Sequence, residues 1–277
     1  MYRNTFINTY LKNGYAFEDA KNEVDFATDV LFNYGYKDFV LGKALKQWQL
    51  EKLEKIFNER ISTHKPIQQI VGQAYFYGRK FFVDENTLIP RPETELLVQA
   101  VLEIAKEIKD SKILDIGTGT GCIPLTLVME NNNILVDSVD ISEKAIEIAK
   151  KNALLHNVLE NVRFIKSDLF ENVEDKYNII VSNPPYIPLK DKESLQVEVR
   201  EFDPALALFT KDEYGIEFYE KIINQANNYL LPDGYIAFEL GINQSEIVEK
   251  MLKDNNFKEI NIINDFNSIP RIVIAKK

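Results

Sequence analysis

Cysteine and histidine are scarce in this chain of 277 residues, which has one cysteine and two histidines. A single cysteine, Cys122, excludes an internal disulfide and is typical of proteins in a reducing cytoplasm. So few thiols and imidazoles also leave almost no ligands for a zinc site. We therefore expect a cytoplasmic protein without a metal site.

Long hydrophobic runs and an excess of positive charge are missing too. No apolar stretch approaches a membrane span, and the polar start MYRNTFINTYLKNG lacks the apolar core of a signal peptide. The net charge of −10 argues against a protein that mainly binds nucleic-acid phosphates, because such binding needs clustered lysine and arginine. We expect a globular monomer with no membrane contact and no direct nucleic-acid binding.

The amino-terminal part has the periodicity of helices. Its apolar residues recur at spacings of three and four in two runs, Ala20, Val24, Ala27 and Leu31, then Leu50, Leu53, Phe57 and Ile61. We interpret residues 1–66 as a small all-helical domain whose apolar faces form their own core. Aromatic runs on both sides of Gly78-Arg79 predict a β-hairpin, within a linker of residues 67–90.

Beyond Pro92 the sequence alternates between apolar strands and helical stretches. Strands are predicted at residues 113–116, 134–139, 162–165, 179–181, 235–238, 260–263 and 272–274. This alternation predicts an α/β fold with a largely parallel sheet covered by helices on both faces. Ligands bind at the carboxyl ends of such strands, so residues 91–277 should hold the functional site.

A glycine-rich loop, Gly117-Thr118-Gly119-Thr120-Gly121, follows the first of these strands. Its pattern is GxGxG: Cys122 stands where a nicotinamide fingerprint needs its third glycine, and the absence of lysine excludes a Walker-type phosphate loop. Asp140 ends the second strand 19 residues after Gly121, the usual place of an acid that accepts hydrogen bonds from a ribose. Asp168 and Leu169 follow the third strand. Together these residues favour an adenosine cofactor without a pyrophosphate, and S-adenosylmethionine fits best.

The fourth strand ends in Asn183-Pro184-Pro185-Tyr186. Prolines there could simply end a strand. A more specific hypothesis is that this turn binds an –NH2 on a planar group during its methylation. That nitrogen is a poor nucleophile and becomes positive as it attacks, so it needs hydrogen-bond acceptors. The Asn183 side-chain oxygen and the Pro184 carbonyl can accept hydrogen bonds from its protons, and two prolines hold these acceptors in place. The Tyr186 ring can pack on the flat substrate group.

The motif NPPY resembles that of amino- and amide-nitrogen methyltransferases of the class I fold. The segments LIPRPETE, from Leu88 to Glu95, and PIQQIVG, from Pro66 to Gly72, closely resemble the protein-(glutamine-N5) methyltransferases of peptide-chain release factors. The resemblance covers nearly the whole chain. It implies a Rossmann-like, mostly parallel seven-stranded sheet that ends in an antiparallel hairpin.

The same resemblance implies the substrate and the roles of the residues. S-adenosylmethionine would be the cofactor, and the glutamine of the Gly-Gly-Gln loop of release factors would be methylated at N5. Gly117 to Gly121 would hold the methionine part of the cofactor, Asp140 its ribose, and Asp168 and Leu169 its adenine. Asn183 would contact both the cofactor and the glutamine amide, which the turn as far as Tyr186 would hold. Arg91, Glu93 and Glu95 are either functional or simply the acidic start of a helix.

Three other functions would use some of the same motifs. An adenine-N6 methyltransferase of nucleic acid uses the same NPPY motif but needs a basic surface, which the net charge disfavours. A non-catalytic scaffold would not need the loop, Asp140 and NPPY together. A dehydrogenase is excluded mainly by Cys122.

Overall fold

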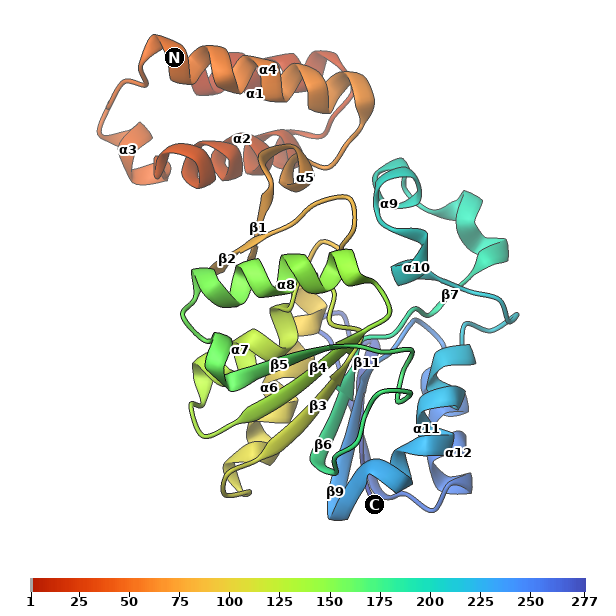
Figure 1. Cartoon of the computed structure of the whole chain (residues 1–277). Coiled ribbons are helices and arrows are strands. Elements are labelled where there is room, and N and C mark those ends of the chain that lie inside the picture. The colour runs from red at the N-terminus through yellow and green to blue at the C-terminus, as the bar shows by residue number, and fades with distance from the viewer. Residues whose placement is uncertain (1) are drawn as a thin grey trace. The chain divides into compact units, whose positions relative to one another are not determined.

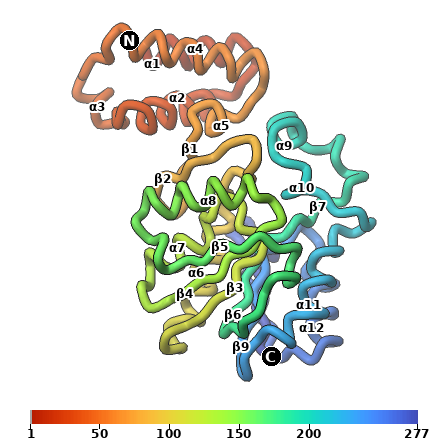
Figure 2. Tube along the Cα trace, in the orientation of Figure 1, coloured from red at the N-terminus to blue at the C-terminus, as the bar shows by residue number. Residues whose placement is uncertain are grey.

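The computed structural model describes residues 2–277, which form two compact units. One unit consists of the chain up to Ala74 together with Gln196–Phe202, and the other consists of Tyr75–Leu195 and Asp203–Lys277. By these bounds the chain leaves the larger unit after Leu195 and re-enters it at Asp203. Figure 2 traces the main chain from the N-terminus to the C-terminus. Among residues 2–277, no helix combines the length and the apolar character needed to cross a membrane.

The smaller unit is a group of helices around its own apolar core. The predicted faces are confirmed, because Ala20, Val24 and Ala27 are buried in one helix and Leu53 and Phe57 in another. Asn33 and His64 end these two helices in the left-handed conformation. The helices are α1 (Tyr2–Lys12), α2 (Phe17–Phe32), α3 (Tyr36–Val40), α4 (Gln47–Thr63) and α5 (Ile67–Val71).

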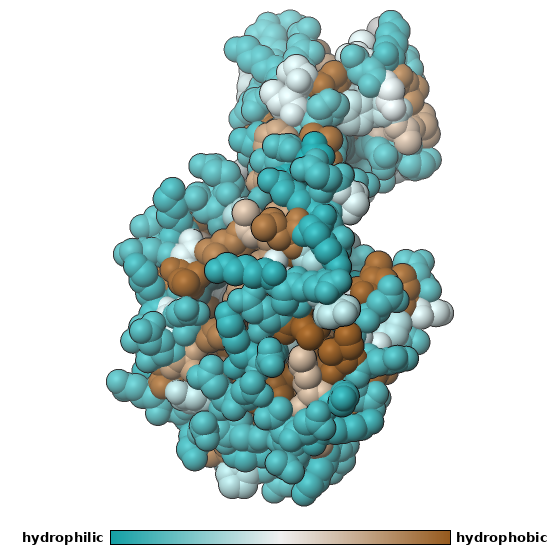
Figure 3. Space-filling view, turned by 90° about the vertical axis from the view of Figure 1, so that its right-hand side faces the viewer, coloured by the Kyte–Doolittle hydropathy of each residue, from teal (hydrophilic) through white to brown (hydrophobic). Residues whose placement is uncertain are grey.

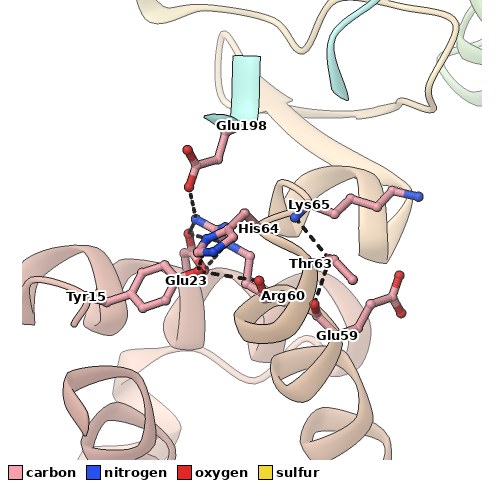
Figure 4. Close-up of polar contacts among 8 residues, drawn as sticks. All are labelled: Tyr15, Glu23, Glu59, Arg60, Thr63, His64, Lys65 and Glu198. Carbon is pink, nitrogen blue, oxygen red and sulfur yellow. Dashed lines mark hydrogen bonds and ion pairs between the residues drawn. The ribbon is translucent and has the colours of Figure 1, made fainter. Parts of the chain in front are cut away.

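A distant segment of the chain, Gln196–Phe202, packs with these helices and contains α9 (Val197–Phe202). The Arg60 guanidinium, only 5% exposed, donates to the Glu23 carboxylate and, through Nη2, to Glu198 Oε1 at 3.0 Å (Figure 4). The Gln69 side chain on α5 donates to the Phe202 carbonyl at 2.9 Å. Residues 67–71 were expected in the linker, but they form helix α5, and Gln69 of this helix binds the segment Gln196–Phe202.

The larger unit is built on one seven-stranded sheet with the order β10-β11-β9-β6-β3-β4-β5 (Figure 1). The five strands from β9 to β5 are parallel, whereas β11 runs antiparallel to both β9 and β10. The mostly parallel sheet with a final antiparallel hairpin is thus confirmed. The strands are β3 (Lys112–Ile116), β4 (Leu135–Asp140), β5 (Val162–Lys166), β6 (Tyr177–Ser182), β9 (Leu230–Glu239), β10 (Lys258–Asn264) and β11 (Pro270–Lys276).

Helices cover both faces of this sheet and create two apolar cores, because alternate strand residues point to opposite faces (Figure 1). Ile113 of β3 packs under the first group of helices, and its neighbour Leu114 packs under the second. The first group is α6 (Pro92–Lys106), α7 (Cys122–Glu130) and α8 (Glu143–Leu155), and the second is α11 (Glu217–Tyr229) and α12 (Ser245–Asp254).

Short elements complete the molecule. The predicted hairpin is confirmed as β1 (Gln73–Phe76) and β2 (Arg79–Phe82), which form a two-stranded sheet. A second small sheet pairs the residues after the NPPY turn with a later segment. The remaining pieces are the 3₁₀ turns Leu159–Asn161 and Leu189–Ser194, helix α10 (Ala205–Leu208), and strands β7 (Ile187–Pro188) and β8 (Phe209–Thr210).

Candidate active site

The register of the parallel strands brings their carboxyl ends to one edge of the sheet. Ile116 of β3 is paired with Val139 of β4 on one side and with Ser182 of β6 on the other. Asp140 is paired with Lys166 of β5, and Ser182 with Phe238 of β9. The residues at or just beyond these ends therefore lie side by side: Gly117, Asp140, Ser167, Asn183 and Glu239.

A cavity of about 450 Å³ opens at this edge, within the size range of small-molecule sites. Of the predicted site residues, those that line it are Gly117, Thr118, Gly119, Thr120, Asp140, Asp168, Leu169, Asn183, Pro184 and Pro185. Gly121 and Tyr186 are not among the described residues that line this cavity. The structure therefore brings together most of the predicted cofactor residues and most of the predicted reaction residues.

Main-chain and side-chain hydrogen bonds fix the glycine-rich loop. The Gly117 and Thr118 amides both donate to the Val139 carbonyl, at 2.9 and 3.0 Å. The Thr120 carbonyl accepts from Asn152 Nδ2 at 2.8 Å, and the same buried Asn152 bonds the main chain of Phe82 on β2. The loop is thus attached both to the sheet and to helix α8.

Gly121 has a packing role in the loop. Its φ is +79°, and a Cβ at this position would lie 3.0 Å from the Leu125 side chain and 3.1 Å from the Ala149 Cβ. A glycine here lets helices α7 and α8 approach the loop closely.

Asp140 stands at the end of β4 with its carboxylate on the cavity wall. Its Oδ2 accepts from the Gly119 amide at 2.9 Å and its Oδ1 from the Ser142 amide at 2.8 Å. Burial raises the pKa of this carboxyl, and the two main-chain hydrogen bonds oppose that shift. Each carboxylate oxygen has a further lone pair, so the group can still accept hydrogen bonds from a ribose.

The NPPY turn begins beside the glycine-rich loop. A Cβ at Gly117 would lie only 3.9 Å from the Asn183 carbonyl oxygen. Asn183 Nδ2 donates to Thr94 Oγ1 at 3.1 Å. At the other end of the turn, the Tyr186 hydroxyl donates to Glu239 Oε1 at 3.3 Å, and the Tyr186 carbonyl accepts from Gln244 Nε2 at 2.9 Å.

The LIPRPETE segment forms the start of α6 and part of the cavity wall. Arg91 lines the cavity and makes an ion pair with the buried carboxylate of Asp203 at 2.6 Å. Burial raises the pKa of Asp203 to about 6, and the Arg91 charge opposes this rise. Glu95 accepts from the Tyr77 amide at 2.6 Å and so ties α6 to the hairpin. Arg91 and Glu95 therefore have structural contacts of their own.

Several residues around the site were not predicted. Thr94 lines the cavity next to Asn183, and Glu239 lies directly behind Thr94. A charged residue placed immediately after the buried strand run Tyr235–Phe238 was the signal that could have identified Glu239. The remaining wall is largely apolar and includes Leu88, Ile141, Leu206, Phe209 and Phe218. Figure 3 shows hydrophobic residues reaching the surface on one face of the larger unit.

Cys122 lies at the start of α7 and lines the cavity. Burial raises the pKa of the Cys122 thiol to about 12, so the thiol stays neutral. Within residues 2–277, no group of three or more His, Cys, Asp or Glu side chains is arranged to hold a metal ion.

Comparisons with known proteins agree with this geometry. The methyltransferase small domain family matches residues 92–206. The release factor glutamine methyltransferase of Fusobacterium nucleatum subsp. nucleatum is 38% identical over 268 residues, which cover 96% of this chain and 75% of that protein. The release factor glutamine methyltransferase of Bacillus cereus is 40% identical over 236 residues, or 82% of each chain.

This chain belongs to the release factor glutamine methyltransferase family. The fold agrees with that of a methyltransferase from Pyrococcus furiosus, with a TM-score of 0.54, 19% identity, and coverage of 82% of this chain and 98% of that one. As a member of the release factor glutamine methyltransferase family, the chain is an S-adenosylmethionine-dependent methyltransferase of the class I fold. The cavity at the sheet edge is therefore its candidate active site.

Proposed function

We propose that this enzyme transfers a methyl group from S-adenosylmethionine to N5 of the glutamine in the Gly-Gly-Gln loop of peptide-chain release factors. The observation that carries the proposal is the pairing of Ile116 with Ser182. This pairing sets the glycine-rich loop and the NPPY turn next to each other on one cavity. Relatives named release factor glutamine methyltransferase support the substrate.

The cofactor side of the cavity fits S-adenosylmethionine. The Gly117–Gly121 loop presents main chain to the methionine part, and Asp140 presents carboxylate lone pairs to the ribose. Asp168 and Leu169 line the cavity beyond β5 and would flank the adenine together with Ile141. When bound, the cofactor supplies an electrophilic methyl group on a sulfonium centre.

The reaction side supplies hydrogen-bond acceptors. The Asn183 side-chain oxygen and the Pro184 carbonyl accept hydrogen bonds from the glutamine –NH2 group, whose lone pair is otherwise delocalised into its carbonyl. These bonds strengthen as positive charge grows on the nitrogen, so they stabilise the transition state more than the ground state. Pro184 and Pro185 restrict the main chain of the turn, which keeps the acceptors in place before substrate binds. We place the Tyr186 ring next to the flat amide group.

The helical unit, which extends past residue 66 and includes α9, is proposed to help dock the release factor. Its support is a group of exposed apolar side chains at α3, where Tyr36, Val40 and Leu41 are each more than 60% exposed. The double variant Tyr36→Ser/Leu41→Ser should raise KM for release factor and leave the dissociation constant of S-adenosylmethionine unchanged. An unchanged KM would exclude this face.

We expect a cytoplasmic monomer that binds its release factor without contacting nucleic acid directly. The net charge of −10 and the single cysteine support this expectation. Light scattering of the purified enzyme tests whether it is a monomer, and a filter-binding assay with duplex DNA tests whether it binds nucleic acid.

The deciding experiment is a transfer assay with labelled S-adenosylmethionine, in which purified release factor and duplex DNA are offered side by side. We expect label in release factor, and its loss when the Gly-Gly-Gln glutamine is replaced. Label in DNA alone would refute the substrate. The Asn183→Ala variant should transfer methyl groups about 10²–10³ times more slowly while cofactor binding is largely kept, because an acceptor for the developing charge is lost. Equal losses of both would show that Asn183 acts through the cofactor or the fold.

A further inference from the structure

A chain of hydrogen bonds starts at the half-buried Asn183 and ends at the buried carboxylate of Glu239. Asn183 Nδ2 donates to Thr94 Oγ1 at 3.1 Å, and Thr94 Oγ1 donates to Glu239 Oε2 at 2.6 Å. Thr94 and Glu239 are 3% and 1% exposed, so water does not compete for the bond between them, whereas the bond from Asn183 is only partly buried. Thr94 belongs to α6 and Glu239 to β9, and they are 145 positions apart in the sequence.

The chemistry of the hydroxyl gives this chain a direction. Thr94 has a single hydroxyl proton, and an ionised Glu239 can only accept it. The Thr94 oxygen is then available to Asn183 only as an acceptor, so the –NH2 of Asn183 must face Thr94. The reversed carboxamide would place Asn183 Oδ1 against the Thr94 oxygen with no proton between them. Asn183 Oδ1 is therefore the end of the carboxamide that does not meet Thr94.

We propose that Thr94 and Glu239 are positioning residues that hold the Asn183 carboxamide with its oxygen available to accept a hydrogen bond from the substrate nitrogen. This inference rests on the proposed function, in which Asn183 is an acceptor for the glutamine –NH2. It adds the two residues that decide which end of a nearly symmetric amide meets the substrate.

Glu239 also supports the far end of the same turn. Its Oε1 accepts from the Tyr186 hydroxyl at 3.3 Å, so one carboxylate bonds directly to the last residue of NPPY and, through Thr94, to the first. The Tyr219 hydroxyl of α11 donates to the Glu239 carbonyl at 2.9 Å and fixes the main chain there. A single buried group thus orients both ends of the reaction turn.

The ionisation of Glu239 gives the proposal a pH dependence. Burial raises the pKa of Glu239 to about 7, against the opposing effects of the Thr94 hydrogen bond, the Arg271 charge and the Tyr186 hydrogen bond, while Glu93 adds to the rise. A protonated Glu239 can donate to Thr94 and so remove the fixed direction. We expect kcat to fall as the pH drops through the pKa of Glu239, and this acid limb to be absent in Glu239→Gln.

The test compares four single variants of the full chain. Thr94→Val removes the hydroxyl at nearly constant volume, and Thr94→Ser keeps it. Thr126→Val is the matched control, because Thr126 is buried in α7 and its hydroxyl finds no hydrogen-bond partner within residues 2–277. Glu239→Gln completes the set. The readouts are kcat and KM with release factor, the dissociation constant of S-adenosylmethionine by calorimetry, and Tm.

We expect Thr94→Val to lower kcat about tenfold, as expected for one lost hydrogen bond of about 1.4 kcal/mol. Cofactor affinity should stay within about twofold, and Thr94→Ser should recover most of kcat. Unchanged kcat in Thr94→Val, or equal losses in the Val and Ser variants, would overturn the proposal. If Thr94→Val fails to fold, Glu239→Gln decides: a persisting acid limb identical to that of the parent would overturn it.

A double-mutant cycle separates this inference from the proposed function. In an Asn183→Ala background, Thr94→Val should cause no further loss of kcat, because the amide that it positions is gone. Full and independent losses would overturn the positioning role. An Asn183→Ala variant with parental transfer rates would instead refute the role of Asn183, and with it the proposed mechanism.

Discussion

Gly215 offers the sharpest steric test of how the reaction turn is held. It lies before α11 with a φ of +75°, and a Cβ there would stand 2.1 Å from the Tyr186 carbonyl oxygen and 2.4 Å from Gln244 Nε2. For the first contact to reach 3.0 Å, the Tyr186 main chain must retreat by about 0.9 Å. Because a displacement of about 1 Å can reduce catalysis roughly 100-fold, we expect Gly215→Ala to lower kcat by about that factor.

The same substitution should destabilise the fold. The left-handed backbone costs an alanine about 1–2 kcal/mol, and forcing the close contact apart adds about 1–3 kcal/mol. The free energy of unfolding from urea titration should therefore fall by about 2–5 kcal/mol. Both numbers are measured on one preparation, with kcat at saturating release factor and cofactor.

Gly78 provides a matched control for the backbone contribution. Its φ is +71° in the hairpin turn of the same unit, but beyond its two chain neighbours no described residue comes within 4 Å of the Cβ that an alanine would add. Gly78→Ala should lose only the backbone contribution and keep kcat. If the two variants lose the same stability and keep the same kcat, the contact between Gly215 and Tyr186 does not position the turn.

Three further outcomes are expected. Asp140→Ala should weaken S-adenosylmethionine binding roughly 10- to 100-fold by calorimetry, because a hydrogen bond to a charged acceptor contributes about 1.5–3 kcal/mol; an unchanged dissociation constant would remove Asp140 from the site. Burial raises the pKa of Asp115 to about 7, so the folded protein is more stable with this carboxyl protonated, by on the order of 4 kcal/mol. This stabilisation is complete below about pH 4 and is lost as the pH rises from there through about 7. Urea titrations at pH 5 and pH 8 should show a smaller loss of stability in Asp115→Asn than in the parent, and equal losses would contradict this assignment. Glu198→Gln should speed hydrogen exchange in residues 196–202, because the ion pair to Arg60 is lost.

The exchange experiment has a matched control in the same segment. Glu201 is more exposed than Glu198, and its carboxylate accepts from the adjacent Arg200. Glu201→Gln should leave the exchange of this segment as in the parent. Equal acceleration in both variants would show that the segment responds to any loss of charge and that the Arg60 ion pair has no special role.

The strands and the cofactor loop could be predicted from the sequence because their signals are local. Runs of three to six residues, mostly apolar, predicted the sheet, and each observed strand contains its predicted run or begins one residue into it, as β4 begins at Leu135. The Gly117–Gly121 loop and Asp140 follow those runs directly, so a parallel register was enough to bring them together. Because of this register, four of the five loop residues line the cavity.

Contacts between distant elements could not be predicted in the same way. The position of Glu239 after a buried strand run could have marked it as a candidate, but nothing in the sequence pairs it with Thr94, and only the fold brings Thr94 Oγ1 within 2.6 Å of Glu239 Oε2. Gln69 lay in an expected linker, yet its amide is buried against the Phe202 carbonyl far along the chain. The sequence predicted a place for the Tyr186 ring against the flat substrate group, but gave no sign of the hydrogen bond from its hydroxyl to Glu239. Each of these depends on tertiary packing that no local pattern encodes.

The proposed roles of the site residues divide the site between strands, with cofactor binding on one side and chemistry on the other. In this proposal the cofactor side is built on β3, β4 and β5, with Asn152 of α8 behind its loop. The reaction side is built on β6 and β9, with Thr94 of α6 between them. Because the residues behind the two sides, Asn152 and Thr94, belong to different helices and make separate hydrogen bonds, a change behind one side should leave the other intact. Asn152→Ala should therefore weaken cofactor binding, whereas Thr94→Val should lower kcat at unchanged cofactor affinity, and an enzyme in which both variants affected both quantities equally would have one indivisible site.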